Sequence, residues 1–323
     1  MKVKWGVLGT ASIAKNCTIP GMLMADSCEL YAISGRNEDK VAEYKEKFGF
    51  KKGYVGYDKL LEDPEVQAVY IPLPNGIHKE WVIAALKAGK HVLCEKPMAL
   101  NADDAKEMMD TARENGVILM EAYAYLHSPY VRALKDEINS GRLGKILYID
   151  TGFITQGYKE DIRLYKNLGG GMIYDLGVYC TTMILSLTDS EIEYVKAVAE
   201  KTSEGVDAFT TVIIGFKNGI RASFVVGMTL GEDTNARYDK LYIHGTEGNV
   251  KSDVEYNQEG KLKYTVRYGN KTKIKKVYAP QNYSLEVENL SKSILGLEKP
   301  LVSEEFTVKN AELIDMILEA IGY

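Results

Sequence analysis

Histidine, cysteine and tryptophan are scarce in this sequence, which contains four, four and two of them among 323 residues. The four cysteines, Cys17, Cys28, Cys94 and Cys180, are scattered and form no C-x-x-C pair. This spacing predicts neither a zinc site nor a disulfide framework. We therefore expect no bound metal and reduced thiols, as in a cytosolic protein.

An excess of one charge is also lacking, since the formal net charge is -5 and 26% of the residues are charged. Such a balance provides no bulk attraction to nucleic acid or to an anionic membrane. We expect no segment long and apolar enough to span a bilayer, and the opening MKVKWGVLG has too short an apolar run for a signal peptide. The expectation is a complete, cytoplasmic protein with a small-molecule partner.

The chain length favours two domains, and the pattern changes near Ala122. Before that point short apolar runs alternate with amphipathic stretches. In order these are KWGVLG and a helix from Ser12, ELYAIS and NEDKVAEYKEKFG, VQAVYIPLP and HKEWVIAALKAGK, HVLCEKP and ADDAKEMMDTARENG, and finally VILMEAY. This alternation predicts a doubly wound parallel sheet with helices on both faces, over residues 1–122.

After a connecting helix around residues 130–139, strand patterns follow one another with turns such as Lys217-Asn218-Gly219 between them. Six runs read as strands: KILYIDTGFITQG, IEYVKAVAEKTS, AFTTVIIGFKNG, IRASFVVGMTL, RYDKLYIHGTEG and KLKYTVRYG. Two helices, over about 284–295 and 308–321, close the chain. We predict an α+β second domain, residues 123–323, with a large, mainly antiparallel sheet.

The first predicted strand leads directly into GTASIA, Gly9 to Ala14, which fits the dinucleotide turn G-x-G-x-x-A with Ala11 at the middle glycine. In such turns the first glycine permits the bend, the middle residue must be small, and the last lets helix and strand pack closely. The alternative is an ordinary strand-to-helix turn. Its position after the first strand of a β/α alternation favours dinucleotide binding, with a phosphate at the helix N-terminus.

The end of the second predicted strand reads ISGRN, where an NAD-selective fold usually has an acidic residue. Ser34 and Arg36 can donate hydrogen bonds to a 2′-phosphate, and the Arg36 guanidinium can stack on adenine. A solvated arginine before a helix capped by Asn37 is the alternative. The pattern favours NADP(H) over NAD(H), which stays possible.

The segment VYIPLPNGIHKEWVIAALKAGKHVLCEKPMAL, together with GGGMIYDLGVYC and IHGTEGNV further on, resembles the Gfo/Idh/MocA family of nicotinamide-dependent oxidoreductases. The resemblance covers essentially the whole chain. It is strongest to the branch containing dimeric dihydrodiol dehydrogenase, NADP-dependent xylose dehydrogenase and glucose-fructose oxidoreductase. It implies an N-terminal Rossmann fold for the first domain.

The resemblance also implies roles for single residues. Lys96 is expected to reach the nicotinamide ribose and the substrate hydroxyl, Tyr179 to transfer the proton, and Asp175 to orient the pair. An ammonium beside a phenol favours the phenolate, which agrees with these roles. The residues expected to contact the dinucleotide are Gly9, Thr10, Ala11, Ser12, Ile13, Ser34, Arg36, Pro72, Leu73, Asn75, His78, Glu95 and Lys96.

Each of these residues also has a structural interpretation. Tyr179 is one of 22 tyrosines, Asp175 is placed to cap a helix, and His78 could begin a helix at the surface. Arg163, before the glycine run, could bind a substrate hydroxyl or anchor its loop. The stretch MEAYAYLHSPY departs from the family pattern at Leu126 to Pro129, so Tyr125 is a further substrate candidate in an altered segment.

The resemblance implies hydride transfer between NADP(H) and a hydroxyl-bearing carbon of a sugar or cyclic vicinal diol. Two alternatives are a dinucleotide-binding, sugar-responsive regulator without turnover and a redox-assisted glycosidase. Apolar residues in TTVIIGF and ASFVVGM predict a homodimer or homotetramer formed through the second domain's sheet. The sequence leaves open whether the bond before Pro97 is cis.

Overall fold

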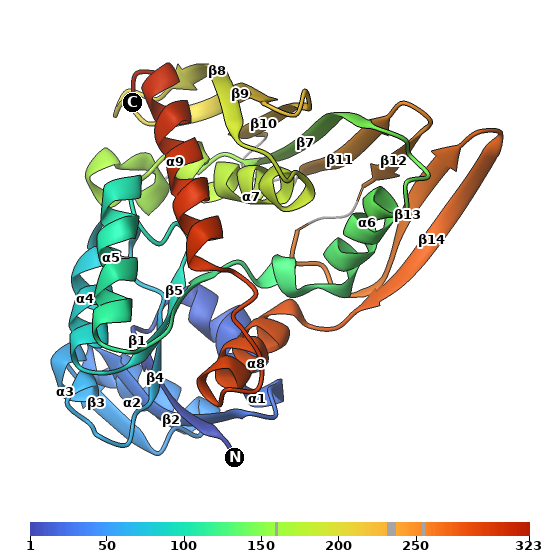
Figure 1. The fold of residues 1–323 in the computed structure, drawn as a ribbon. Coiled ribbons are helices and arrows are strands. Elements are labelled where there is room, and N and C mark those ends of the chain that lie inside the picture. The colour runs from blue at the N-terminus through green and yellow to red at the C-terminus, as the bar shows by residue number, and fades with distance from the viewer. Residues whose placement is uncertain (159–160, 231–236, 254–255) are drawn as a thin grey trace. The chain divides into compact units, whose positions relative to one another are not determined.

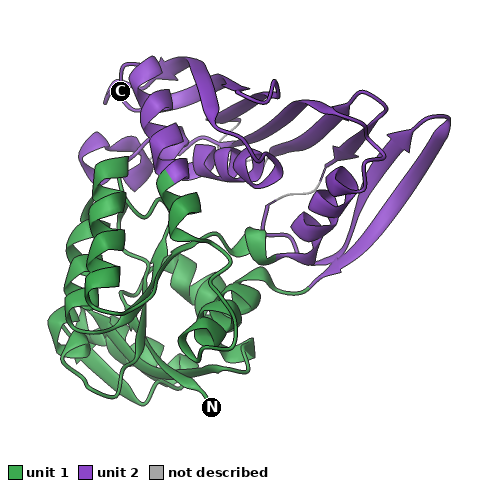
Figure 2. Ribbon diagram, in the orientation of Figure 1, with its two compact units in different colours: residues 1–127, 280–308 green, residues 128–279, 309–323 purple. Residues whose placement is uncertain are grey.

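The computed structural model describes residues 1–158, 161–230, 237–253 and 256–323, which form two compact units (Figure 2). Unit 1 comprises residues 1–127 and 280–308, and unit 2 comprises residues 128–279 and 309–323. Neither unit is one continuous segment. The division near Ala122 expected from the sequence lies close to the first crossing, but the segment 280–308, which we assigned to the second domain, belongs to unit 1.

Unit 1 is built on a six-stranded parallel sheet in the order β3-β2-β1-β4-β5-β6 (Figure 1). Its strands are β1 (Val3–Leu8), β2 (Cys28–Gly35), β3 (Lys52–Val55), β4 (Ala68–Ile71), β5 (His91–Glu95) and β6 (Leu119–Ala122). The central strands consist of buried apolar residues, as expected for strands covered on both faces. The predicted parallel α/β domain is confirmed.

Helices flank this sheet, with α1 and α8 on one side and α4 and α5 on the other (Figure 1). Their bounds are α1 (Ile19–Met24), α2 (Glu38–Phe48), α3 (Tyr57–Leu61), α4 (His78–Lys87), α5 (Ala102–Glu114) and α8 (Asn282–Ile294). Short helical turns cover Ala14–Thr18, Asn75–Ile77 and Ala124–His127. Asn37 caps α2 and Asn101 caps α5, each accepting from a backbone N–H three residues later.

Packing of α8 against α1 explains why residues 280–308 belong to unit 1. Gly21 of α1 lies so close to the start of α8 that a Cβ there would be 2.8 Å from the backbone of Tyr283 and Ser284. The indole Nε1 of Trp5 in β1 donates to Ser291 Oγ of α8 over 3.0 Å. The sequence pattern predicted α8 but not its packing against α1 and β1, because these contacts join residues more than 250 positions apart.

Unit 2 contains an eight-stranded sheet in the order β14-β13-β12-β11-β7-β10-β9-β8, in which only the β7–β10 pair is parallel. The strands are β7 (Ile146–Gln156), β8 (Ile192–Lys201), β9 (Asp207–Phe216), β10 (Arg221–Leu230), β11 (Tyr238–Gly245), β12 (Gly248–Ser252), β13 (Gly260–Tyr268) and β14 (Lys271–Ala279). The predicted mainly antiparallel sheet is confirmed, and Gly219 turns the β9–β10 hairpin with φ 89°.

Unit 2 also contains α6 (Pro129–Asn139), α7 (Val178–Leu187) and most of α9 (Glu304–Ala320), together with short turns over Ile162–Leu164, Lys166–Leu168 and Ile173–Gly177. Contrary to our expectation, the stretch Lys166–Leu187 is long and apolar enough to cross a membrane. Its apolar window is 83% buried inside the protein, and a buried core helix passes the same test of length and composition.

Candidate active site

The dinucleotide loop follows β1 as the sequence predicts. Gly9 has φ 125°, and its N–H donates to the carbonyl of Ser34 over 2.8 Å. A Cβ at this position would lie 3.1 Å from Leu73 Cδ2, so glycine is required both for conformation and for space. Tyr44 Oη donates to the carbonyl of Thr10 over 3.1 Å and supports the loop from α2.

Loop residues Thr10, Ala11 and Ile13 are half-buried and Ser12 is exposed at the start of the helical turn. Their backbone amides therefore lie at a helix N-terminus after a parallel strand, where a phosphate is favourably bound. Cofactor pyrophosphate fits this loop by backbone conformation and by the small side chain at Ala11.

The two residues proposed to bind the 2′-phosphate, at the end of β2, differ in their exposure. Arg36 is exposed just after the strand, as that role requires. Ser34 is fully buried within β2, and its hydroxyl donates to the carbonyl of Val7 over 3.3 Å. Ser34 is therefore a correction. Its side chain lies in the protein interior, because both faces of β2 are covered at this end of the strand.

The segment after β4 contains Pro72 and Leu73, which are buried, and Asn75, which is half-buried. His78, the first residue of α4, is fully buried, and both of its ring nitrogens face backbone carbonyls. Nδ1 lies 2.8 Å from Pro97 O and Nε2 lies 2.7 Å from Leu73 O. Both ring nitrogens thus have partners within the protein, and the alternative of a surface histidine is wrong. The expected contact of His78 with the cofactor stays a prediction.

Glu95 ends β5, and Lys96 follows it, at the same carboxyl edge of the sheet as the dinucleotide loop. Both residues are half-buried, and the Lys96–Pro97 peptide bond is cis. Tyr70 Oη donates to Glu95 Oε1 over 2.6 Å and accepts from Thr18 Oγ1 over 2.9 Å. Burial raises the pKa of Glu95, whereas the Tyr70 hydrogen bond and the Lys96 charge lower it.

A second buried carboxyl, Glu286 of α8, lies within electrostatic range of Glu95. Its side chain is fully buried, and neither carboxyl oxygen has a hydrogen-bond partner within the part of the chain that the structure describes. Burial, and then the negative charge of Glu95, raises the pKa of Glu286 well above its ordinary value. Burial therefore favours the protonated form of Glu286, a feature that no sequence pattern indicated.

In unit 2 the structure brings Arg163 and Asp175 together, with Arg163 Nε 2.6 Å from Asp175 Oδ2. The intervening glycine run makes this possible. Gly170 N–H donates to Tyr165 O and Gly171 N–H to Arg163 O, and a Cβ at Gly170 would be 2.5 Å from Arg163 O. Arg163 is thus an anchor of its loop onto Asp175, one of the two roles left open by the sequence.

The helical run that carries Asp175 and Tyr179 begins at Ile173, and the carboxylate of Asp207 in β9 binds its first backbone N–H. This fully buried carboxylate accepts from Ile173 N over 2.9 Å and from Thr210 Oγ1 over 3.0 Å. A Cβ at Gly171 would collide with Asp207 Oδ1. Burial raises the pKa of Asp207 to about 6, although these hydrogen bonds lower it.

The ring of Tyr179 lies among aromatic side chains that the sequence analysis did not identify. Its centroid is 5.6 Å from that of Phe153 and 5.3 Å from that of Tyr256, and Asn257 Nδ2 lies 3.4 Å from Tyr179 Oη. Among the described residues, Asn257 is the only non-glycine residue with positive φ, at 53°. The guanidinium of Arg237 lies 4.1 Å above the Phe153 ring.

Tyr125, the other substrate candidate, is buried with 2% of its surface exposed. In the departing segment, Ser128 caps α6, accepting from Tyr130 N over 3.3 Å. His127 Nε2 lies 3.3 Å from Asn289 Oδ1, and burial lowers its pKa to about 4. These contacts give His127 and Ser128 structural partners within unit 1 and at the start of α6.

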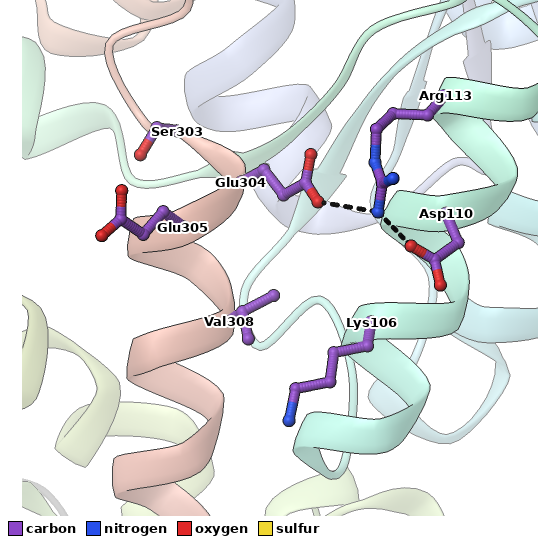
Figure 3. Close-up of a pocket in the computed structure, with 7 residues that line it drawn as sticks. All are labelled: Lys106, Asp110, Arg113, Ser303, Glu304, Glu305 and Val308. Atoms are coloured by element: carbon purple, nitrogen blue, oxygen red, sulfur yellow. Dashed lines mark hydrogen bonds and ion pairs between the residues drawn. The ribbon is translucent and has the colours of Figure 1, made fainter.

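A pocket of about 540 Å³ lies between α5 and the start of α9 and contains none of the predicted site residues (Figure 3). Its lining carries charges of both signs, and Arg113 pairs there with Asp110 and with Glu304 (Figure 3). No group of three or more potential metal ligands occurs in residues 1–158, 161–230, 237–253 and 256–323. The predicted residues of unit 1 gather instead at the carboxyl edge of its sheet.

A parallel sheet with a glycine turn after β1, followed by a unit with a mainly antiparallel sheet, defines a two-domain dinucleotide-dependent oxidoreductase. The family model for oxidoreductases with an NAD-binding Rossmann fold matches residues 3–123, and that for the GFO/IDH/MocA C-terminal domain matches residues 131–251. The chain belongs to the Gfo/Idh/MocA family.

Three relatives illustrate the breadth of this family. The chain is 29% identical to D-xylose 1-dehydrogenase (NADP(+)) 2 of Haloferax volcanii, over 98% of this chain and 96% of the relative. It is 31% identical to trans-1,2-dihydrobenzene-1,2-diol dehydrogenase of Mus musculus, over 77% and 74%. A crystal structure of a 3-ketoreductase from Actinomadura kijaniata with NADP and TDP-benzene matches with a TM-score of 0.92 and 27% identity, over 99% and 98%.

Proposed function

We propose that this protein is an NADP(H)-dependent oxidoreductase acting on a hydroxyl-bearing carbon of a sugar or cyclic vicinal diol. The observation that carries the proposal is the shared carboxyl edge of the unit 1 sheet, where the Gly9 loop, Arg36 and Lys96 all follow strand ends. Open α/β sheets bind ligands at this edge. The sugar and diol oxidoreductases among the relatives support the substrate class.

When bound, the nicotinamide supplies the hydride acceptor or donor. In the oxidative direction the substrate C–H bond breaks as the hydride leaves, and the hydroxyl proton must pass to a basic side chain as the carbonyl forms. Lys96 and Tyr179 are the candidates for that proton transfer. Arg36 would hold the 2′-phosphate, and the loop amides from Thr10 to Ile13 the pyrophosphate.

The test is a substrate panel. Purified protein is mixed with NADP or NADPH and with aldoses, ketosugars, inositols and trans-dihydrodiols, and absorbance of the reduced nicotinamide is followed. Turnover of one polyhydroxylated class, faster with NADP(H) than with NAD(H), is expected. Cofactor binding without turnover across the whole panel would replace this proposal by a regulatory role.

We also propose that unit 2 self-associates through the sheet face that bears Val198 and Ile213, whose exposed fractions are 77% and 46%. Apolar side chains of this size on a sheet face are a feature of protein interfaces. The occupant we propose is a second copy of the chain, giving a dimer or a tetramer. Light scattering checks this, and a monomer that persists at high concentration contradicts it.

A cytoplasmic location is likewise a proposal. It is supported by four free cysteines, of which Cys28, Cys94 and Cys180 are buried. Fractionation of the cells that produce the protein tests it, and recovery outside the cytoplasm would overturn it.

A further inference from the structure

One peptide unit next to Lys96 is bound on both of its sides by buried ionisable side chains. The carbonyl of Pro97 faces His78 Nδ1 at 2.8 Å, and the N–H of Met98, the other half of the same peptide group, donates to Glu121 Oε1 over 2.9 Å. His78 is fully buried, and Glu121 is 3% exposed. The family resemblance assigned no role to Glu121.

The contacts of the two side chains extend this arrangement over three neighbouring strands. His78 Nε2 reaches Leu73 O, after β4, at 2.7 Å. Glu121 lies in β6, and Tyr123 Oη donates to the same Oε1 over 3.1 Å. The chain of hydrogen bonds thus ties the carboxyl ends of β4, β5 and β6 together at the peptide that follows Lys96.

The geometry offers each side chain partners of the right kind. Two carbonyl oxygens face the imidazole, and each can only accept, so a protonated nitrogen on either side of the ring finds an acceptor. Glu121 Oε1 receives two donors, which suits a carboxylate. The peptide group between the two side chains has its carbonyl and its N–H polarised in the matching sense.

Burial acts against both charges. It is the largest effect on His78 and holds the pKa of this imidazole below its ordinary value, although the two carbonyls raise it. Burial also raises the pKa of Glu121 to about 7, although the Met98 and Tyr123 donors lower it. Lys96 is the charged side chain within electrostatic range of both groups, and its ammonium lowers both pKa values. Isolated buried charges of this kind are costly, whereas a pair with all its hydrogen bonds made is tolerated.

We propose that His78 and Glu121 act as one positioning pair for Lys96, binding the Pro97–Met98 peptide from opposite sides. This inference deepens the proposed function and rests on it for the role of Lys96. The pair holds the backbone that carries the lysine, and neither member needs to touch substrate or cofactor. Loss of either contact frees the same peptide, so the effects of losing them are not independent.

The first test is spectroscopic and needs no substrate. With only four histidines in the chain, the ring nitrogens of His78 can be assigned in ¹⁵N NMR spectra by comparison with H78Q. We expect the ¹⁵N shifts of His78 to change in E121Q, because both side chains bind the same peptide group. Shifts of His78 that are the same in E121Q and in the wild-type protein would overturn the proposal, whether or not any substrate is found.

The second test is a double-mutant cycle of H78Q, E121Q and their combination, with cooperative unfolding confirmed for each. We expect each single variant to lower kcat about tenfold or more, with KM for NADPH changed less than about threefold. The double variant should lose about as much as the more damaged single variant. Multiplying losses, or an unchanged kcat in both single variants, would contradict a shared role.

His91 provides the matched control. Its Nδ1 accepts from Ile118 N over 3.0 Å and so also links β5 to the start of β6, but at the opposite edge of the sheet from Lys96. H91Q should leave kcat within about twofold of the wild-type value. A loss in H91Q equal to that in H78Q would show that any weakened strand contact has this effect, and would overturn the specific role of the pair.

Discussion

Arg163 Nε donates to Asp175 Oδ2 over 2.6 Å, while its Nη1 donates to Asp161 over 2.9 Å. Burial alone would lower the pKa of Arg163, but the Asp175 carboxylate holds it above its ordinary value. Asp175 lies four residues before Tyr179 in one helical run. The carboxylate expected to orient the catalytic pair is therefore itself oriented by an arginine from the preceding loop.

Replacing Arg163 by methionine should accordingly lower kcat by about tenfold to a hundredfold, because the Asp175 carboxylate loses its ion pair with the guanidinium. NADPH affinity should stay within about threefold, since both residues belong to unit 2. Steady-state kinetics measure the first effect and fluorescence titration the second. Lys217→Met, which removes an exposed ion pair with Glu191, is the control and should change neither.

Lys96→Ala should fold and bind NADPH but lose turnover by about two orders of magnitude or more, because the ammonium takes part in proton transfer. Single-turnover kinetics on the best substrate of the panel provide the measurement. Lys87→Ala, on the exposed part of α4, serves as the control. Near-normal turnover in the Lys96 variant would make this lysine a solvated charge.

Tyr179→Phe removes one hydroxyl and leaves a ring that can keep its packing against Phe153 and Tyr256. We expect a strong fall in kcat with almost unchanged NADPH affinity, since the hydroxyl acts on the substrate. Tyr256→Phe is the comparison: its hydroxyl contacts Thr151 over 2.7 Å within unit 2, and its loss should cost less turnover. Equal turnover in Tyr179→Phe and the wild type would exclude Tyr179 as the proton-transfer residue.

The preference for NADP over NAD should depend on Arg36 and not on Ser34. Arg36→Ala should weaken NADP binding by about 10- to 100-fold and leave NAD binding nearly unchanged, since charged hydrogen bonds contribute roughly 1.5–3 kcal/mol. Ser34→Ala should leave the ratio of the two affinities unchanged, because its hydroxyl already donates to Val7. Isothermal titration calorimetry with both cofactors measures the ratio. A loss of NADP preference in the Ser34 variant would indicate that the Ser34 hydroxyl does contact the 2′-phosphate.

Asp207 predicts a pH dependence of stability. Its folded pKa, about 6, is raised above the ordinary 3.8, so its contribution to stability is complete below pH 3.8 and is lost as pH rises through about 6. The stability lost across this window amounts to roughly 3 kcal/mol, because the pKa differs by about two units and each unit corresponds to about 1.4 kcal/mol. Relative to Asp207→Asn, the wild-type unfolding free energy should therefore fall across this window in denaturant titrations. A constant difference between the two proteins would place the carboxyl pKa near its ordinary value.

Patterns within a few residues predicted much of this structure. The β/α alternation, the Gly9 turn, the Asn37 cap and the β9–β10 hairpin all depend on local chemistry, and the structure contains each of them. The missed strands are those without a clear apolar pattern. β3 has only four residues and no fully buried position, and β12 has only five, GNVKS. The edge strand β14 reads KTKIKKVYA, whose lysines suit an exposed edge but hide the strand.

Side-chain partners were beyond the reach of local patterns. A histidine at position 78 looks the same in sequence whether it faces a cofactor or two carbonyls, and only the pairing of β4 with β5 decides. The burial of Ser34 likewise depends on the cover of both faces of β2, which involves residues distant in the sequence. The Arg163–Asp175 ion pair and the Asp207 cap depend on the backbone conformation of Gly170 and Gly171, and the spacing of residues in the sequence does not predict that conformation.

The return of residues 280–308 to unit 1 has a consequence for the order in which the protein forms on the ribosome. The nucleotide-binding strands are synthesised first, yet the indole of Trp5 obtains its partner Ser291 only after more than 280 further residues have been added. Until α8 emerges, the nascent chain must keep the surface of α1 that α8 later covers from meeting other apolar segments. Factors that shelter nascent chains therefore have a longer task with this protein than with one whose nucleotide-binding domain is a single continuous segment.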